Sequence, residues 1–182
     1  MAKAIGMVEF TSVSRGIYAA DQMVKVSDVE IVMAGATCPG KYVAIVHGDV
    51  ASVSDAVATG ERVAGEHLVD AILIPNVSPQ VFPAITGTTI PDAIKALGII
   101  ESFSQATMLI AADAILKAAA LQPLELRLGN GLGGKSYFTF TGDVAAVEAG
   151  VEAGKAAMKG KGLLLNTEII PAPAPQLVES LL

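Results

Sequence analysis

Short apolar runs rich in β-branched residues alternate with stretches of helical spacing along the first half of this 182-residue chain. Four of the runs predict strands, at Lys3–Phe10, Val29–Met33, Tyr42–Val46 and Leu68–Ile74. Two stretches predict amphipathic helices, the first capped by Ser12 or Ser14 and the second by Asp49. Their apolar positions are Ile17, Ala20, Met23 and Val24 in the first helix, and Val50, Val53, Val57 and Ala64 in the second. Gly35 to Gly40 is predicted to be a loop.

This order, β-α-β-β-α-β, is that of the split-βαβ or ferredoxin-like arrangement, an antiparallel sheet with helices on one face. The second half repeats the order from Lys95–Ser102 to Leu163–Ile170. We therefore predict an α+β protein with two tandem ferredoxin-like domains. The domains are expected at residues 3–87 and 93–182, with a linker at 88–92.

Two further segments lie outside the predicted sheets. The connection from Asn76 to Asp92 has room for a short helix. The chain ends in a Pro/Ala-rich tail from Pro171 with a few apolar residues, which we expect to pack on a neighbour or to be partly mobile.

The two halves also share motifs. Ala20-Asp21 with Lys25 returns 92 residues later as Ala112-Asp113 with Lys117. Gly40-Lys41 returns as Gly134-Lys135 after 94 residues, and Ile74-Pro75 as Ile170-Pro171 after 96. The copies therefore differ by two small insertions, and the period is far too long for a solenoid repeat of roughly 20–50 residues.

The central loop breaks the repeat. The first copy carries Thr37-Cys38-Pro39-Gly40, and the second carries Gly131-Leu132-Gly133-Gly134 in the matching place. Cys38 is the only cysteine in the chain. This unduplicated residue indicates where special chemistry could lie, although a lone cysteine is most often a small inert hydrophobe.

Composition and charge narrow the classes of protein. The net charge of −6 and the pI near 4.8 argue against nucleic acid or an anionic membrane as partner. One cysteine excludes an internal disulfide framework, and no apolar run reaches the roughly 20 residues of a membrane span. We expect a cytoplasmic protein. Hydrophobic residues make up 52% and charged residues 16%, which is more apolar surface than small domains can bury alone, so an obligate assembly is expected.

The second loop also imitates a phosphate-binding motif. Residues 129–136 fit the pattern G-x-x-x-x-G-K-[ST], which requires a strand before the loop and a helix after it. Leu124–Leu128 is a predicted strand, but Tyr137–Thr141 is aromatic and β-branched and predicts another strand. We therefore interpret the glycines as a hairpin loop.

Taken together, the motifs resemble those of bacterial microcompartment shell proteins, most closely the tandem-domain trimeric class of the propanediol-utilisation T type. The resemblance covers essentially the whole chain and rests on Ala4-Ile5-Gly6 with Glu9, Ala20-Asp21 with Lys25, Thr37-Cys38-Pro39-Gly40-Lys41, Gly48-Asp49-Val50, Leu73-Ile74-Pro75 and Gly133-Gly134-Lys135. It implies a homotrimer of two-domain chains, a pseudo-hexameric tile in the wall of a bacterial microcompartment in the cytoplasm. The implied partners are other shell proteins and encapsulated redox enzymes, with neither nucleic acid nor membrane.

The resemblance also implies roles for particular residues. The loops that line the tile's central pore would be Ala36, Thr37, Cys38, Pro39 and Gly40, together with Asn130, Gly131, Leu132, Gly133 and Gly134. Lys25 and Lys117 match the tile-edge lysines of the family. The Arg and His that often follow the fourth-strand Ile-Pro are replaced here by Asn76-Val77 and Ala172-Pro173, which leaves that edge contact in doubt.

In T-type relatives the matching cysteine binds a [4Fe–4S] cluster, so the resemblance implies one cluster per trimer, bound through Cys38. A threefold axis turns one thiolate into three, which can bind three irons and leave the fourth iron for a small ligand. The implied function is non-enzymatic: electron transfer across the shell or delivery of the cluster. One alternative is a metal-free pore tile for small-metabolite transport. Another, of a different class, is a ferredoxin-like sensor or enzyme with a phosphate on its glycine loop.

The remaining polar candidates are interpreted as structural. Apart from Cys38, the sequence shows no unduplicated set of acid and base residues that an enzyme would need. His47 and His67 have no partner at metal-ligand spacing and are interpreted as structural or surface residues. Glu9 and Glu101 occur in both copies and are expected to be ion-pairing or loop-bonding groups.

Overall fold

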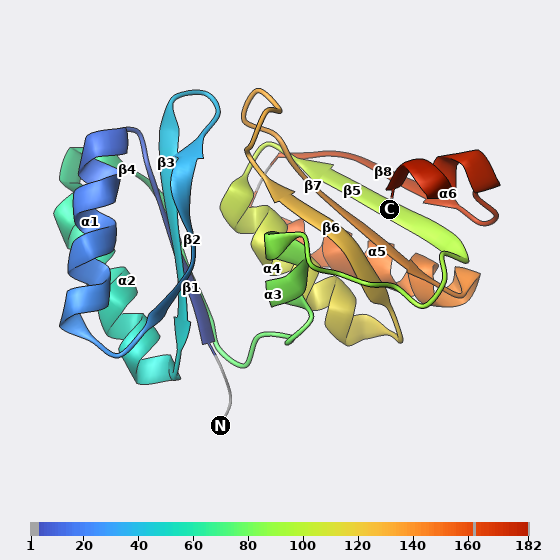
Figure 1. Ribbon diagram of the computed structural model, residues 1–182, viewed down its shortest axis with the longest axis horizontal. Helices are drawn as coiled ribbons and strands as arrows, with labels where there is room; N and C mark the ends of the chain where they lie inside the picture. The colour runs from blue at the N-terminus through green and yellow to red at the C-terminus, as the bar shows by residue number, and fades with distance from the viewer. Residues whose placement is uncertain (1–3, 162, 182) are drawn as a thin grey trace. The chain divides into compact units, whose positions relative to one another are not determined.

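The computed structural model describes residues 4–161 and 163–181, and it contains two four-stranded sheets (Figure 1). The chain divides into two compact units. The first unit extends to Val77 and includes the loop 130–134, and the second holds residues 78–129 and the chain from Lys135. Lys3, with which the first strand and domain were predicted to begin, and Leu182, the predicted end of the second domain, lie outside the described residues.

The first unit has the predicted order of elements. Its strands are β1 (Ala4–Phe10), β2 (Glu30–Thr37), β3 (Lys41–Gly48) and β4 (Leu68–Ile74), and its helices are α1 (Val13–Val26), α2 (Val50–Ala64) and the short 3-10 turn η1 (Gly65–His67). The strands lie in the order β2-β3-β1-β4, and every neighbouring pair is antiparallel. Both α-helices cover the same face of the sheet (Figure 1).

The second unit repeats this architecture. It contains α3 (Val81–Thr86), β5 (Ala96–Ser102), α4 (Gln105–Ala118), β6 (Gln122–Leu128), β7 (Ser136–Gly142), α5 (Val144–Met158), β8 (Leu164–Ile170) and α6 (Pro175–Leu181). The strand order is β6-β7-β5-β8, again antiparallel throughout. The predicted α+β class and the two ferredoxin-like domains are confirmed, and α3 fills the space left for a short helix.

Local sequence explains the repeated helix starts and the close approach of helix to sheet. Ser12 caps α1 by accepting the N–H of Arg15 at 3.3 Å, and Ser104 caps α4 by accepting that of Thr107 at 3.1 Å. A Cβ at Gly6 would lie 2.4 Å from a methyl group of Val57. The repeated glycine at the third residue of the first strand therefore lets a helix pack directly on it, and the first-unit core forms there.

Two predictions about this fold need correction. Gly35, Ala36 and Thr37 belong to β2 and pair with β3, so the loop is shorter than expected. Ile17 and Val50, placed on the apolar helix faces, are 54% and 40% exposed in the isolated chain. The buried face of α1 consists of the predicted Ala20 and Met23 together with the small residues Gly16 and Ala19, which let the helix approach the sheet closely.

Candidate functional site

The predicted pore loop of the first copy is a three-residue turn between β2 and β3. Cys38 is half-buried, whereas Pro39 and Gly40 are exposed, and the Cys38–Pro39 peptide is cis. Gly40 has a φ of +68°, a conformation that favours glycine. The only thiol of the chain therefore lies at the tip of a hairpin, with its backbone held between two paired strands.

The matching loop of the second copy is longer. Ala36 lies opposite Tyr42 across β2 and β3, and Leu128 lies opposite Ser136 across β6 and β7. Five residues (37–41) connect the first pair and seven (129–135) connect the second, so one of the two insertions falls in this loop. Thr37 therefore corresponds to Gly129, and not to Gly131 as the sequence comparison placed it.

The two loops share one compact unit. Asn130 to Gly134 is counted with the first unit, and a Cβ at Gly134 would lie 3.2 Å from Cδ of Pro39. Gly131, Gly133 and Gly134 all have positive φ values, so the second loop depends on glycine for its path. Its single large side chain, Leu132, is half-buried. The structure thus brings the two predicted pore loops together.

A repeated ion pair fixes the base of each loop. Lys41 Nζ lies 3.1 Å from Glu9 Oε1 in the first copy, and Lys135 Nζ lies 3.5 Å from Glu101 Oε2 in the second. Each lysine directly follows its loop, and each glutamate lies on the first strand of its sheet. The expectation that Glu9 and Glu101 are ion-pairing groups is confirmed.

The predicted tile-edge lysines also form matching pairs. Lys25 Nζ lies 2.6 Å from Asp21 Oδ2, and Lys117 Nζ lies 2.6 Å from Asp113 Oδ2, each one helical turn apart. The hydrogen bond with Lys25 lowers the pKa of Asp21. The repeated Asp and Lys therefore satisfy each other within the chain, and a contact with neighbouring tiles stays a prediction.

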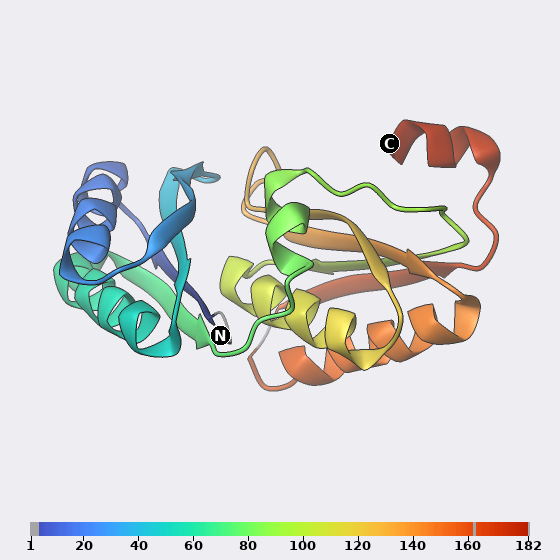
Figure 2. The same cartoon turned by 60° about the horizontal axis from the view of Figure 1, so that its bottom comes forward.

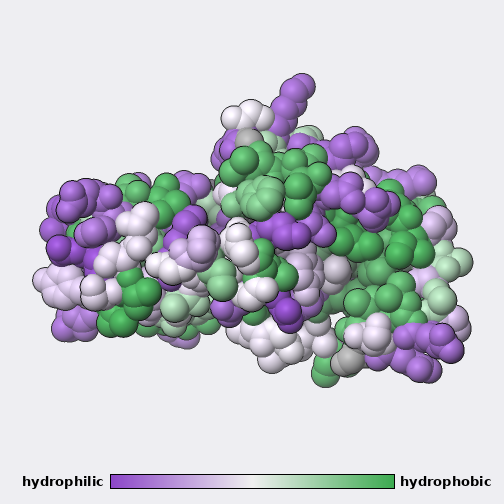
Figure 3. All heavy atoms as spheres, turned by 90° about the horizontal axis from the view of Figure 1, so that it is seen from above, coloured by the Kyte–Doolittle hydropathy of each residue, from purple (hydrophilic) through white to green (hydrophobic). Residues whose placement is uncertain are grey.

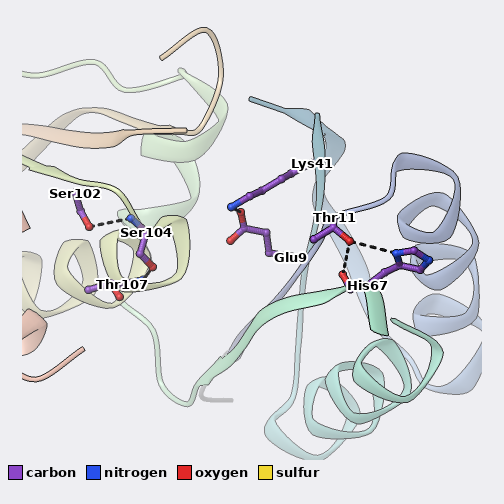
Figure 4. A network of polar contacts seen from close by, with 7 residues as sticks. All are labelled: Glu9, Thr11, Lys41, His67, Ser102, Ser104 and Thr107. Atoms are coloured by element: carbon purple, nitrogen blue, oxygen red, sulfur yellow. Dashed lines mark hydrogen bonds and ion pairs between the residues drawn. The ribbon is translucent and has the colours of Figure 1, made fainter. Parts of the chain in front are cut away.

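The two histidines have structural partners. The Thr11 hydroxyl lies 3.2 Å from the His67 imidazole (Figure 4). The His67 carbonyl also accepts the Thr11 N–H at 2.8 Å, which joins the end of β1 to the start of β4. His47 Nε2 lies 3.4 Å from Glu30 Oε2. Within the described residues, no three His, Cys, Asp or Glu side chains form a group that could hold a metal ion.

The glycine-rich loop after β6 lacks the context of a phosphate site. A strand, β7, follows Lys135 where a phosphate-binding loop requires a helix with free N–H groups. The hairpin interpretation of these glycines is confirmed.

One polar cluster was missed by sequence reasoning. The Tyr137 hydroxyl donates a hydrogen bond to Glu125, whose other oxygen lies 2.5 Å from the Arg127 guanidinium. Arg127 also lies 5.7 Å from the centre of the Tyr137 ring. Burial, and then the bond to Glu125, raise the pKa of Tyr137 to about 12. Sequence gave no signal for this cluster, because Met33, Gly35 and Val43 occupy the matching positions of the first copy.

The fold and the two loops define a duplicated ferredoxin-like protein in which one hairpin carries the only cysteine of the chain and the matching hairpin is rich in glycine. No helix in the described part of the chain is long and apolar enough to cross a membrane. The BMC domain family matches residues 4–77 and 96–173, so this chain belongs to the bacterial microcompartment shell proteins.

Individual relatives agree with this assignment. The chain is 38% identical to the bacterial microcompartment shell protein PduT of Citrobacter freundii, over 95% of this chain and 94% of that protein. A crystal structure of a microcompartment protein from Desulfitobacterium hafniense DCB matches with a TM-score of 0.94 and 44% identity, covering 98% and 99% of the two chains. The shell protein EutM of Salmonella typhimurium is 36% identical over 47% of this chain and 88% of its own length, so one EutM corresponds to one domain here.

Proposed function

We propose that this shell protein forms a homotrimeric, pseudo-hexagonal tile whose central pore is lined by both loops and binds one [4Fe–4S] cluster through Cys38. The tile is a structural component and not an enzyme. The observation that carries the proposal is the single half-buried thiol at the tip of a hairpin in a duplicated shell protein.

Unequal burial of matching surfaces supports assembly. Leu109 on α4 is fully buried, whereas its counterpart Ile17 on α1 is 54% exposed. Conversely, β1 is buried at every residue, whereas Ile99 and Glu101 of β5 are only half-buried. The isolated chain thus presents one uncovered helix face and one uncovered sheet face, and Figure 3 shows apolar side chains reaching its surface in patches.

These two faces differ from each other, so a contact between them joins chains head to tail. Heterologous contacts of this kind form a closed ring when the rotation closes and an open filament when it does not. Six similar domains from three chains form such a ring, which supports the pseudo-hexagonal tile.

The donor set fits the cluster only in the assembled state. One chain supplies one thiol and, among the described residues, no group of three ligands, so the other ligands must come from further copies. Threefold symmetry supplies two more Cys38 thiolates, which are the usual ligands of iron–sulfur clusters. When bound, the cluster supplies one-electron redox chemistry.

The chain's own residues would hold that site in place. The Glu9–Lys41 pair and the β2–β3 pairing fix the base of the Cys38 turn. The second loop has Leu132 and glycines and no cysteine, so a trimer would carry three Cys38 thiols around its pore and not six. We propose that this arrangement serves electron transfer across the shell or delivery of the cluster to encapsulated redox enzymes.

Anaerobic purification tests the proposal. We expect brown protein with about four irons and four sulfides per three chains, and a trimeric mass by light scattering. The Cys38→Ser variant should lose the iron and the colour and keep the trimer. Colourless, iron-free trimer from anaerobic cells would contradict the cluster and support a metal-free pore tile, and a monomer would contradict both.

A further inference from the structure

A docking segment is repeated in this chain along with the domains. Residues 75–85, which follow β4, read Pro-Asn-Val-Ser-Pro-Gln-Val-Phe-Pro-Ala-Ile, and residues 171–181, which follow β8, read Pro-Ala-Pro-Ala-Pro-Gln-Leu-Val-Glu-Ser-Leu. Each segment has Pro-Gln in the same place and apolar residues at matching positions. Both begin a helix with the same turn: Val81 donates to the Ser78 carbonyl at 3.0 Å, and Leu177 donates to the Ala174 carbonyl at 2.9 Å.

From Ser78 onwards, the first segment belongs to the second unit and packs there. Helix α3 contacts β6 and α4, and Val81 and Ala84 are buried there. The N–H of Ser78 donates to Asp113 Oδ1 at 2.7 Å, and the Gln80 side chain donates to the Leu121 carbonyl at 3.3 Å. The segment that follows one copy therefore occupies a site formed by the helix and the edge strand of the next copy.

The second segment is not seated in this way. Helix α6 has no buried residue in the described chain, and Leu177 and Leu181 are 37% and 38% exposed. Figure 2 shows α6 standing off the side of its own sheet that faces away from α4 and α5. A helix with an apolar face and no core of its own is stable only when another surface covers that face.

The matching site on the first copy is open. Asp21 corresponds to Asp113, and both hydrogen bonds that it accepts in the described chain fall on Oδ2. Its Oδ1, the atom that in Asp113 takes the Ser78 N–H, remains available. On the neighbouring edge strand, Ile31 is 49% exposed, whereas its counterpart Pro123 is buried.

We propose that α6 of one chain docks on the α1–β2 site of a second copy, as α3 docks on α4 and β6. The N–H of Ala174 donates to Asp21 Oδ1, Gln176 to the Val29 carbonyl, and Leu177 takes the place of Val81. This inference rests on the head-to-tail trimer of the proposed function and names the segment that joins its chains. In this arrangement Asp21 would accept a backbone N–H in addition to its ion pair with Lys25, as Asp113 does in addition to its pair with Lys117.

A disulfide test uses the full chain in a Cys38→Ser background. Asp21→Cys with Ala174→Cys should oxidise to covalent dimers and trimers on a non-reducing gel. The matched control is Ser78→Cys with Asp113→Cys, which should lose its free thiols while it remains a single-chain band. Each single cysteine variant should give no ladder of cross-linked chains.

Three outcomes would overturn the docking of α6. The first is that the Asp21→Cys/Ala174→Cys variant stays uncross-linked while the control forms its disulfide. The second is that this variant forms its disulfide within one chain, and the third is that light scattering shows a monomeric protein. A reduced trimer without the inter-chain disulfide would reject the docking and leave the proposed tile intact. A monomer would reject the tile as well.

A second variant tests the docking of α6 independently, in case the double cysteine variant does not fold. Leu177→Asp changes an exposed residue, so the chain should fold normally by circular dichroism. The trimer dissociation constant should rise about tenfold or more, since an apolar contact at a chain boundary is lost. An unchanged dissociation constant would contradict the proposal.

Discussion

Residues that the duplication made identical have different environments in the two copies. The Glu9 side chain is 4% exposed and belongs to the first sheet's buried strand, whereas the Glu101 side chain is 36% exposed. Asp21 is exposed, whereas Asp113 is buried and holds both Lys117 and the Ser78 N–H. Sequence identity between copies therefore predicts the pairing partner, but it does not predict how much stability the pair provides.

The loop-base pairs offer a direct test of this difference. Glu9→Gln should lower the free energy of unfolding by about 2 kcal/mol, because it leaves the Lys41 ammonium without a counter-charge in a partly buried site. Glu101→Gln should cost less than about 1 kcal/mol, because that pair is screened by solvent. Urea unfolding at one protein concentration measures both, and equal losses would contradict the argument.

Tyr137 should ionise only at strongly alkaline pH. Its pKa is raised to about 12 by burial first and by the hydrogen bond to Glu125 second. Because the folded-state pKa is raised, the neutral Tyr137 contributes stability that is fully present below the ordinary value near 10 and is lost as the pH rises towards 12. In an absorbance titration, Glu125→Gln should shift the ionisation of Tyr137 to lower pH, and an unshifted step would show that Glu125 does not act on Tyr137.

At the scale of elements, the helix that follows the third strand begins differently in the two copies. Asp49 caps α2 by accepting the Ser52 N–H at 2.9 Å and the Ser52 hydroxyl at 2.7 Å. Its counterpart Asp143 makes no capping bond and pairs with Lys95 at 2.9 Å. The same sequence signal, Gly-Asp-Val, thus has two structural uses.

Asp49→Ala should therefore lower Tm by roughly 2–6 °C, and the control Asp143→Ala should lower it less. The backbone N–H of Ser52, and then its hydroxyl, lower the pKa of Asp49. A lowered folded-state pKa provides stability above the ordinary value of 3.8, and that stability is lost as the pH falls through the folded value. The Tm difference between wild type and Asp49→Ala should consequently shrink in acid, and calorimetry at about pH 7 and about pH 3 should show it.

The elements show what a single sequence can predict. Periodicity located every strand and the four long helices, because burial against one sheet imposes those periods. It misplaced Gly35–Thr37, because small residues in an edge strand look like a loop. It missed α6, although Pro175-Gln176 repeats the Pro79-Gln80 that precedes α3. The pore-lining role of the two loops stays a prediction from the resemblance, and their unequal length needed the strand register.

At the scale of the whole molecule, the excess of apolar residues is explained by surfaces that the isolated chain leaves open. Ile17 and Tyr18 on α1 are 54% and 53% exposed, whereas Leu109, the counterpart of Ile17, is fully buried. In the proposed trimer, a further copy of the chain covers the surface that is buried in one domain and exposed in the other. We expect the burial of these apolar surfaces, and not the pore loops, to determine how many chains assemble.

Substitution of Ile17 separates assembly from folding. Ile17→Lys places a charge on a residue that is exposed in the single chain, so the fold should survive, while the head-to-tail contact must bury an unpaired ammonium. We expect light scattering to show monomers at concentrations where the unmodified protein forms the proposed trimer. Ile90→Lys is the matched control, because Ile90 is 94% exposed and should tolerate the charge without loss of the trimer. Trimers from Ile17→Lys would show that α1 lies outside the chain boundary, and the unequal burial of the two copies would then need another explanation.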